Sequence, residues 1–476
     1  MSSKNSFYIT TTLPYVNAEP HIGFALEILQ ADVLARWHRL VGDDVFFNTG
    51  TDEHGQKIFE AAEKAGKDVR EYADYYAEKF GELKKALNLS VDAFVRTTDD
   101  KHVRAAQEIW NRCKSRGDIY EKEFEGLYCV GCERFLSQRD IIDGKCAIHQ
   151  AEPQFLKEKN WFFKFKKYEE KLLKYLENPN TIIPNWRREE AINFVKEGLE
   201  DFSISRDRSR LSWGIPVPDD DTQVMYVWFD ALTNYISTLG WPDEGGNFKK
   251  FWQEGETLQL AGKDQIRFQS LIWQAMLMSA GIKNTDKIFY HGFINSGGQK
   301  MSKSLGNVIS PYELVEKYGT DATRYLLLRH VHPMEDTDVT WDKLDEWHEA
   351  HLANGLGNLV SRIMTLAVAN LEKPAEIPER EDMEEYFAPL KKFEINGAID
   401  YIWNKIGDLD LYIQESKPWE SRDAQVISGL VRKLYSIARM LNPFMPETSA
   451  KIKMFIKENK KPENLFPRLN SSTSLL

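Results

Sequence analysis

Hydrophobic positions in the first part of the chain follow two alternating periods. Residues 7–16 (FYITTTLPYV) are rich in β-branched and aromatic side chains, which predicts a buried strand ending at Pro14. Apolar residues then recur at three- and four-residue spacing over 20–42, which predicts an amphipathic helix. A second strand and turn (44–55, DVFFNTGTDEHG) and a second helix (56–66) follow. Alternating strands and helices are typical of a parallel sheet, so the expected class is α/β.

This alternation is interrupted after about residue 115. A cysteine-rich stretch covers residues 127–149, and the sheet-type pattern returns only at QVMYVWFDALTNYI, which begins at Gln223. Residues 115–222 are therefore predicted to be an insertion that splits one nucleotide-binding-type domain into 1–114 and 223–292. A linking region over 293–342 would follow.

No strand pattern is evident from about residue 343 onward. Three segments with helical periodicity (344–371, 395–414 and 425–441) are separated by proline-bearing linkers. The expected architecture of 343–476 is an all-α helical bundle appended to the α/β domain.

Composition limits the class of protein without identifying it. The 476 residues suit about three domains, and 42% apolar with 28% charged residues is ordinary for a soluble globular protein. A net charge of −11 disfavours binding of polyanions by the whole surface, although a local basic groove stays compatible with it. No signal peptide is recognisable, and the apolar segment 270–281 is too short to span a bilayer. We expect a cytoplasmic protein that is not in a membrane.

The cysteines indicate a metal site. Cys129-x2-Cys132-x13-Cys146-x2-His149 has the spacing of a zinc knuckle, offering three thiolates and one imidazole to a tetrahedral ion. Because the protein fills all four positions, the Zn2+ would be structural, with one ion per chain. Cys113 lies outside the cluster and is expected to be a buried free thiol.

Two short motifs indicate a phosphate site. His21 and Gly23 fall at the start of the first helix, where free N–H groups and the helix dipole attract phosphate and a glycine permits close approach. A histidine that only caps its helix is the alternative. In SGGQKMSKSLGN (296–307), Lys300 and Lys303 could close over a triphosphate, whereas the alternative is a solvated surface loop. The two motifs together favour a site that binds the phosphates of a nucleotide.

PYVNAEPHIGF and KMSKS resemble the two signatures of class I aminoacyl-tRNA synthetases. The wider text, including TTTLPYVNAEPHIG, FFNTGTDEHG, YVWFDALTNYI and FYHGFINSGGQKMSKSLGN, is similar to the methionyl-tRNA synthetase family over nearly the whole chain. The resemblance implies a Rossmann-type catalytic domain split by a connective peptide, a lysine-loop linking region and a helical anticodon-binding domain. It implies a methionine–tRNA ligase that uses ATP with Mg2+, L-methionine and tRNA(Met).

The resemblance also implies roles for individual residues. His21, Lys300 and Lys303 would be catalytic, and Asp52 would hold the amino group of methionine. The remaining residues form three groups: for the methionine side chain, Leu13, Tyr15, Trp228, Ala231, Leu232, Tyr235, Phe268 and Gln269; for ATP, Gly23, Gly262 and Asp264 besides the catalytic three; and for the anticodon, Asn358, Arg362 and Trp419.

Three positions depart from the family pattern. Phe24 replaces the second histidine of the HIGH-type signature, Gln265 replaces an aliphatic residue, and Gln269 replaces a histidine near the methionine sulfur. These departures keep two alternatives open: a non-catalytic RNA-binding paralogue, and a related enzyme for another small amino acid. The insertion is too short for a knuckle plus a large editing domain, and a monomer is expected because the chain ends soon after the helical region.

Overall fold

The computed structural model describes residues 5–131, 134–136, 138–148, 150–301, 306–378 and 383–469. The chain divides into two compact units, each built from several segments. The first unit comprises residues 1–20, 38–82 and 91–291, and the second comprises 21–37, 83–90 and 292–476.

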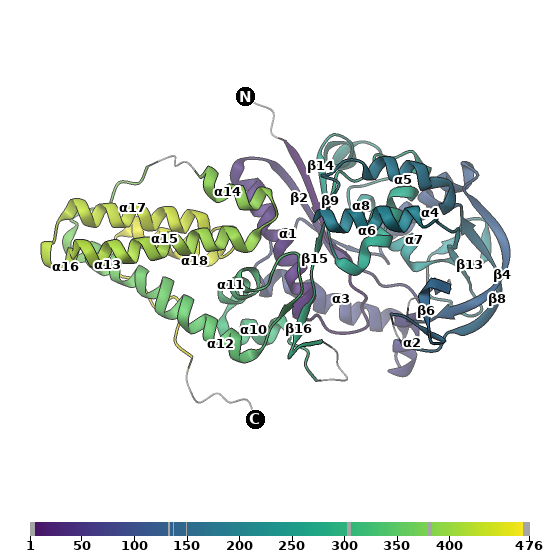
Figure 1. Ribbon diagram of the computed structural model, residues 1–476, viewed down its shortest axis with the longest axis horizontal. Helices are drawn as coiled ribbons and strands as arrows, with labels where there is room; N and C mark the ends of the chain where they lie inside the picture. Colours follow the sequence, from purple (N-terminus) through teal and green to yellow (C-terminus); the bar gives the residue numbers. More distant parts are fainter. Residues whose placement is uncertain are drawn as a thin grey trace. The chain divides into compact units, whose positions relative to one another are not determined.

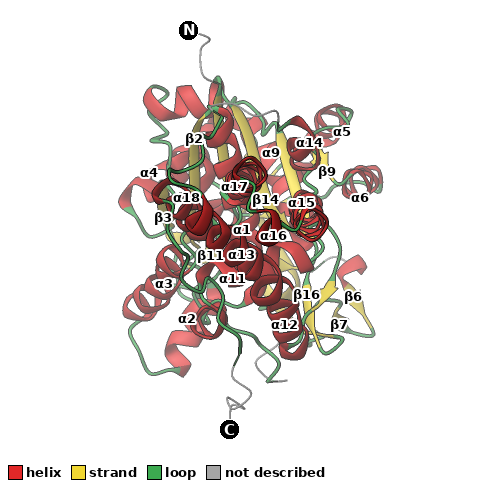
Figure 2. Cartoon of the chain, turned by 90° about the vertical axis from the view of Figure 1, so that its left-hand side faces the viewer, coloured by secondary structure: helices red, strands yellow, loops and turns green. Residues whose placement is uncertain are grey.

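A six-stranded parallel sheet organises the first unit, with the strand order β3-β2-β1-β14-β15-β9. Its strands are β1 (Ser6–Thr10), β2 (Asp44–Thr51), β3 (Ala93–Arg96), β14 (Glu256–Gly262), β15 (Lys287–His291) and β9 (Ile182–Ile183). All of the pairings are parallel, as the strand–helix alternation predicts. Figure 2 draws β2, β3, β14 and β9 of this sheet as yellow strands.

The first strand is shorter than the sequence pattern predicts. β1 ends at Thr10, although the Thr11 N–H still donates to Asn48 O of β2 at 3.3 Å. The next bridge joins Tyr15 to Asp52, the residue that follows β2. Pro14 lacks an N–H group and cannot continue the ladder, which is consistent with the chain leaving the sheet before it. The segment between Thr10 and Tyr15 is thereby placed at the carboxyl ends of the strands.

Helices in the first unit connect and cover the sheet strands. They are α2 (Gln56–Lys64), α3 (Val69–Ala86, continuing into the second unit), α4 (Asp100–Ser115), α7 (Val227–Ala231), α8 (Asn234–Ser237), η3 (Phe248–Gln253), η4 (Lys263–Gln265), η5 (Arg267–Ile272) and α9 (Trp273–Ala280). Helix α4 ends at the point where the sequence pattern changes.

The inserted segment contributes small antiparallel sheets and two helices. The elements are β4 (Ile119–Cys129), β5 (Arg134–Phe135), η1 (Gln138–Asp140), β6 (Ile141–Ile142), β7 (Lys145–Cys146), β8 (Gln154–Phe163), η2 (Phe165–Tyr168), α5 (Glu169–Leu176), α6 (Asn185–Lys196), β10 (Phe202–Ser203), β11 (Ser205–Asp207), β12 (Pro216–Val217) and β13 (Asp220–Met225). Long strands β4 and β8 form its main hairpin. The insertion also supplies β9, which pairs with β15 at one edge of the parallel sheet.

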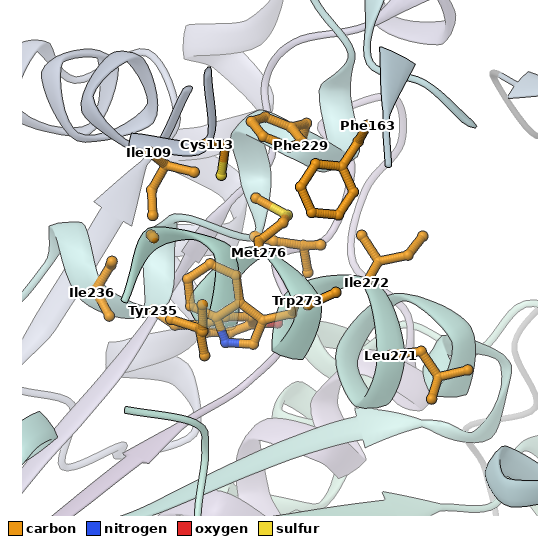
Figure 3. Packing of buried hydrophobic residues seen from close by; sticks show 14 of the residues in the cluster. Ile109, Cys113, Phe163, Phe229, Tyr235, Ile236, Leu271, Ile272, Trp273 and Met276 are labelled. Atoms are coloured by element: carbon orange, nitrogen blue, oxygen red, sulfur yellow. The ribbon is translucent and has the colours of Figure 1, made fainter. Parts of the chain in front are cut away.

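One continuous apolar cluster joins the insertion to the helices of the first unit. Figure 3 shows Cys113 of α4, Phe229 of α7 and Met276 of α9 converging on one region, with Phe163 of β8 nearby. Cys113 is fully buried, and burial raises the pKa of its thiol to about 12. The expectation of a buried free thiol at this position is confirmed.

The second unit is largely helical. Its elements are most of α1 (Ile22–Val41), β16 (Ile294–Ser296), β17 (Gln299–Lys300), α10 (Pro311–Tyr318), α11 (Thr320–His330), β18 (Thr337–Asp338), α12 (Trp341–Trp347), η7 (His348–Gly357), α13 (Asn358–Asn370), α14 (Glu384–Lys391), α15 (Ile395–Ser416), α16 (Pro418–Ser421), α17 (Ala424–Leu441) and α18 (Pro446–Glu458). Beyond Asp338 the described residues form no strand, as predicted for this region. In Figure 1 the long helices α13, α15 and α17 run beside one another as a bundle.

A fully buried ion pair ties α1 to α11 inside the second unit. Arg324 Nη2 lies 2.7 Å from Asp32 Oδ2, and both side chains are 0% exposed. The Arg324 guanidinium also donates to the backbone carbonyls of Leu87, Pro443 and Phe444. One side chain therefore joins α1 to the loop between α17 and α18.

One described segment, Trp341–Asn370, is long and apolar enough to cross a membrane by length and composition. It comprises α12, η7 and α13. Helix α13 packs against α17 and α18 and buries Leu359, Val360 and Ile363. An apolar face of this kind is expected of a helix that contributes to the core of a bundle.

Candidate functional site

Asp52 lies at the carboxyl end of β2, where open α/β sheets bind their ligands. Its residue exposure is only 2%. The Asp52 N–H donates to Pro14 O at 3.0 Å, and the Val16 N–H donates to Asp52 O at 3.2 Å. These two backbone bonds fix the position of Asp52 beside Tyr15. A buried carboxylate at this edge suits a small cationic group, because an ammonium in a dry pocket needs a charged partner.

Tyr15, which forms a bridge with Asp52, belongs to a group of three aromatic rings in the first unit. The Trp228 and Phe268 rings stack with centroids 4.0 Å apart and planes 15° apart. Tyr15 meets Trp228 edge-on, with centroids 6.0 Å apart. All three residues are partly exposed, so the core does not cover them completely. Flat, polarizable rings are a favourable surface for an unbranched thioether.

Tyr235 and Gln269 form the buried polar part of the same group. Gln269 Nε2 donates to the Tyr235 hydroxyl at 2.5 Å, and both residues are nearly inaccessible. The Tyr8 hydroxyl donates to Tyr235 O at 2.8 Å and holds its backbone. Gln269 is carried by the π-helical segment η5, a local irregularity that is frequent at functional sites. Gln269 therefore donates a hydrogen bond, as a histidine at this position could do.

The remaining pocket residues of the sequence prediction lie in the first unit as well. Ala231 and Leu232 are buried at the end of α7, and Leu13 is half-buried after β1. Gly262 is the last residue of β14 and Asp264 follows it, exposed, in η4. Gln265, whose partner could not be inferred from the sequence, donates to Asp264 Oδ2 at 3.2 Å.

The HIG turn begins α1 in the second unit. Gly23 N–H donates to Nδ1 of His21 at 3.1 Å, so a neutral His21 ring carries its proton on Nε2. A Cβ at position 23 would lie 2.8 Å from Cε1 of His21 and 3.9 Å from the terminal methyl of Met301. Only glycine therefore lets the imidazole fold back over the first turn of the helix. Phe24 is half-buried and contributes its N–H to the His21 carbonyl.

The lysine loop also belongs to the second unit. Strands β16 and β17 form a hairpin in which Asn295 pairs with Lys300 through the backbone. Gly297 and Gly298 in its turn have φ of 64° and 74°, a conformation that favours glycine. The Ile22 N–H at the start of α1 donates to Ile309 O at 3.1 Å, after the loop. Lys303 lies outside the described residues.

Two of the four knuckle residues are described. Cys129 ends β4 and Cys146 ends β7, and both side chains are buried. Each follows a paired strand and precedes a tight turn, and the Gln150 N–H closes one of these turns onto Cys146 O at 2.8 Å. Thiols at the ends of two short hairpins fit a zinc knuckle. Cys132 and His149 lie outside the described residues.

The anticodon residues predicted from the sequence lie in the bundle. Asn358 begins α13 and is exposed, and Trp419 in α16 is 47% exposed. Arg362 forms an ion pair with Asp410 of α15. An exposed indole suits base stacking.

Sequence reasoning missed a buried polar network in the first unit. Asp230, in α7, accepts hydrogen bonds from His54 and His102, which lie far from it in the sequence. Glu53 beside His54 is also buried and receives a bidentate bond from Arg96. The sequence shows His54 only as a histidine in the TDEHG turn (51–55), and no sequence pattern indicates that it pairs with Asp230.

The HIG turn, the KMSKS segment and the parallel sheet are features of a class I aminoacyl-tRNA synthetase. Comparison with known proteins agrees: the family described as "tRNA synthetases class I (M)" matches residues 7–146 and 136–364. A methionine–tRNA ligase of Thermotoga maritima is 40% identical, covering 96% of this chain and 76% of its own. One from Rickettsia bellii is 38% identical over 99% of this chain and 96% of its own.

A solved structure extends the similarity to three dimensions. Mycobacterium tuberculosis methionyl-tRNA synthetase in complex with methionyl-adenylate superposes with a TM-score of 0.88 at 36% identity, covering 94% of this chain and 93% of its own. The chain belongs to the methionyl-tRNA synthetase family, whose members are methionine–tRNA ligases.

Proposed function

We propose that this enzyme activates L-methionine through the residue groups described above and transfers it to tRNA(Met). The observation that carries the proposal is the buried Asp52, which Tyr15 links to the stacked rings of Trp228 and Phe268. A carboxylate binds the ammonium of methionine, and the rings bind its thioether. The methionyl-adenylate complex of the Mycobacterium tuberculosis relative supports the same ligand here.

The reaction has two balanced steps. A carboxylate oxygen of methionine attacks the α-phosphorus of ATP, so a P–O bond forms and pyrophosphate leaves. A ribose hydroxyl at the 3′ end of tRNA then attacks the acyl carbon, loses its proton, and AMP leaves. Neither step needs a protein nucleophile, so the chain's contribution is orientation and stabilisation of charge.

We assign His21, Lys300 and Lys303 to the phosphates. His21 Nε2–H donates to a phosphate oxygen, because Nδ1 already accepts from Gly23. The two ammonium groups neutralise charge that develops as pyrophosphate leaves. Bound Mg2+ supplies further charge neutralisation on ATP. Gly262 and Asp264 are assigned to the adenosine.

Methionine selectivity is assigned to the pocket residues. Tyr15, Trp228 and Phe268 provide aromatic faces, and Leu13, Ala231 and Leu232 complete the apolar surface. Gln269 fixes the Tyr235 hydroxyl, so that polar atoms are held in defined directions near the thioether. A side chain with branching at Cβ, such as valine, would be excluded by shape.

We assign a structural Zn2+ to Cys129, Cys132, Cys146 and His149. The burial of Cys129 and Cys146 at strand ends supports this assignment.

Asn358, Arg362 and Trp419 are assigned to the anticodon, with Trp419 stacking on a base. Because Arg362 is paired with Asp410, hydrogen bonding by Arg362 to a base would compete with this ion pair. We propose that the enzyme acts as a monomer, and family membership supports action in the cytoplasm, where translation takes place.

The assignment of the lysine loop is tested by ATP–pyrophosphate exchange. We expect Lys303→Ala to slow methionine-dependent exchange by roughly 10²- to 10⁴-fold, as loss of a group that stabilises transition-state charge does. Lys287→Ala is the matched control, because Lys287 pairs with Glu256 on the sheet and has no assigned role. Equal rates for the two variants would remove Lys303 from the catalytic group.

A further inference from the structure

Asp230 is a completely buried carboxylate that the reaction does not use directly. It lies in α7 between two residues of the methionine pocket, Trp228 and Ala231, and is 0% exposed. Oδ2 lies 3.0 Å from Nδ1 of His54, and Oδ1 lies 3.1 Å from Nε2 of His102. The three side chains are referred to here as the Asp230 network.

The network joins separate elements that carry pocket residues. His54 lies two residues after Asp52 in the turn that follows β2, whereas His102 lies in the first turn of α4. The second ring nitrogen of His102 contacts Ser237 Oγ at 3.0 Å, in the same short helix as Tyr235. Asp230 therefore connects the ammonium-binding turn with the helices that carry the aromatic wall.

Each hydrogen bond in the network has a defined direction. A carboxylate accepts only, so His54 donates from Nδ1 and His102 donates from Nε2. Burial opposes ionisation of Asp230, but the two histidines outweigh it and lower the pKa of the carboxyl. The Ser237 hydroxyl contacts Nδ1 of His102 at 3.0 Å and the Asn234 carbonyl at 3.4 Å. The carboxylate thus keeps its charge and holds both rings in one orientation.

Apolar packing alone would not define this geometry. Phe229, adjacent to Asp230, meets Trp110 of α4 edge-on at 5.7 Å and lies in the large apolar cluster that Figure 3 shows. Such contacts bring α7 and α4 together, but they depend weakly on small shifts along the helix. Directional hydrogen bonds remove that freedom. A buried charge is a poor way to gain stability, so a positional role explains the Asp230 network better than a stabilising role does.

We propose that Asp230 is a positioning residue for methionine binding, and that the Asp230 network sets the spacing between Asp52 and Trp228. This inference rests on the proposed function, because it assumes that the two residues hold the ammonium and the thioether of one ligand. The network touches neither methionine nor ATP in this account, and it acts through the elements that it joins.

The test uses variants of the two histidines that either keep or remove the donor. An asparagine side chain can place an N–H near the position of Nδ1, and a glutamine near that of Nε2. His54→Asn and His102→Gln therefore keep the bond to Asp230, whereas His54→Leu and His102→Met remove it at similar volume. Methionine-dependent exchange gives KM for methionine and for ATP in each full-length variant.

We expect His54→Leu and His102→Met to raise KM for methionine roughly ten- to hundredfold, the effect of losing a hydrogen bond to a charged group. KM for ATP should change less than about threefold, and the donor-keeping variants should recover most of the loss in methionine affinity. An equal rise in both KM values, or no advantage of donor-keeping over donor-removing variants, would overturn the proposal. If the donor-removing variant of one histidine does not fold, the donor-keeping and donor-removing variants of the other histidine test the proposal.

His38→Met is the structural control. His38 also pairs with an aspartate, Asp43, at 2.7 Å and stacks on Phe7, but at the opposite ends of the sheet strands from Asp52. It should lower the unfolding temperature without a selective rise in KM for methionine. A selective rise in this control would mean that any lost histidine pair disturbs the pocket and would overturn the proposal. Absence of methionine-dependent exchange by the unaltered enzyme would instead contradict the proposed function.

Discussion

Burying a carboxylate is costly unless charged or hydrogen-bonding partners compensate for lost water, and we propose that the ammonium of methionine is one such partner of Asp52. The residue is 2% exposed and is held through its own backbone beside Tyr15. At the residue scale, we propose that Asp52 and the Trp228–Phe268 stack bind two chemically different ends of methionine. Substitutions at these residues should therefore raise KM for methionine, whereas substitutions at the residues assigned to adenosine should raise KM for ATP.

Asp52→Asn tests this separation. The amide removes the charge at nearly constant volume, so we expect KM for methionine to rise roughly ten- to hundredfold. KM for ATP should change little. Asp264→Asn, at the exposed adenosine position, should show the reverse selectivity. Steady-state exchange kinetics measure both constants, and a shared effect of Asp52→Asn on both substrates would contradict its assignment to the ammonium.

Residue identities in the motifs could be predicted from the sequence, but most of their partnerships could not. The role of Gly23 became specific only when its Cβ position was seen to overlap the His21 ring. Asp230 shows the limit more sharply, because both histidine partners are more than a hundred residues away. The spacing of residues along the chain does not indicate such pairs, because they depend on tertiary packing.

Helices and strands could be predicted where the periodic spacing of apolar residues extends over many residues. The first helix, the second strand and the long bundle helices were expected from their apolar spacing and are present as α1, β2, α13, α15 and α17. β9 was not expected, because two residues cannot show a period and its pairing with β15 is parallel and distant. The cross-links between elements are likewise visible only in three dimensions, as the Asp32–Arg324 pair illustrates.

Asp32→Asn should destabilise the protein by about 3–5 kcal/mol at neutral pH, because it leaves the Arg324 guanidinium buried without its charged partner. Burial opposes ionisation of Asp32, but Arg324 and Arg36 outweigh it and lower its pKa below the ordinary 3.8. A depressed carboxyl pKa contributes stability above the unfolded value and loses it as pH falls. The gap between variant and wild type should be constant from about pH 8 to 5 and narrow only below about pH 4.

Urea unfolding across this pH range measures the gap. Asp408→Asn, on the exposed face of α15, is the control and should change stability by less than about 0.5 kcal/mol. A gap that closes between about pH 8 and 6 would contradict the account, because it would assign the stabilisation to a group that titrates there.

The knuckle gives a second prediction at the element scale. Elemental analysis of freshly purified protein should find one zinc per chain, and Cys146→Ala should lose it, because three ligands hold the ion poorly. Cys113→Ala, which removes a buried thiol outside the cluster, should retain the zinc. Protein that is folded and active but contains no stoichiometric zinc would contradict the knuckle assignment.

At the scale of the whole molecule, the chain passes repeatedly between two compact units. The HIG turn belongs to the second unit and the strand before it to the first, a division that sequence patterns do not show. The residues assigned to methionine lie in the first unit, and those assigned to the phosphates lie in the second. Full-length similarity to methionine–tRNA ligases relates both sets to one reaction.

The most direct test of that account is ATP–pyrophosphate exchange by the unaltered enzyme, with each of the standard amino acids supplied in turn. We expect rapid exchange with methionine and, with every other amino acid, exchange efficiency lower by roughly a hundredfold or more. The departures at Phe24 and Gln269 should leave this selectivity in place. No exchange with any amino acid, or preferred exchange with leucine or cysteine, would contradict it.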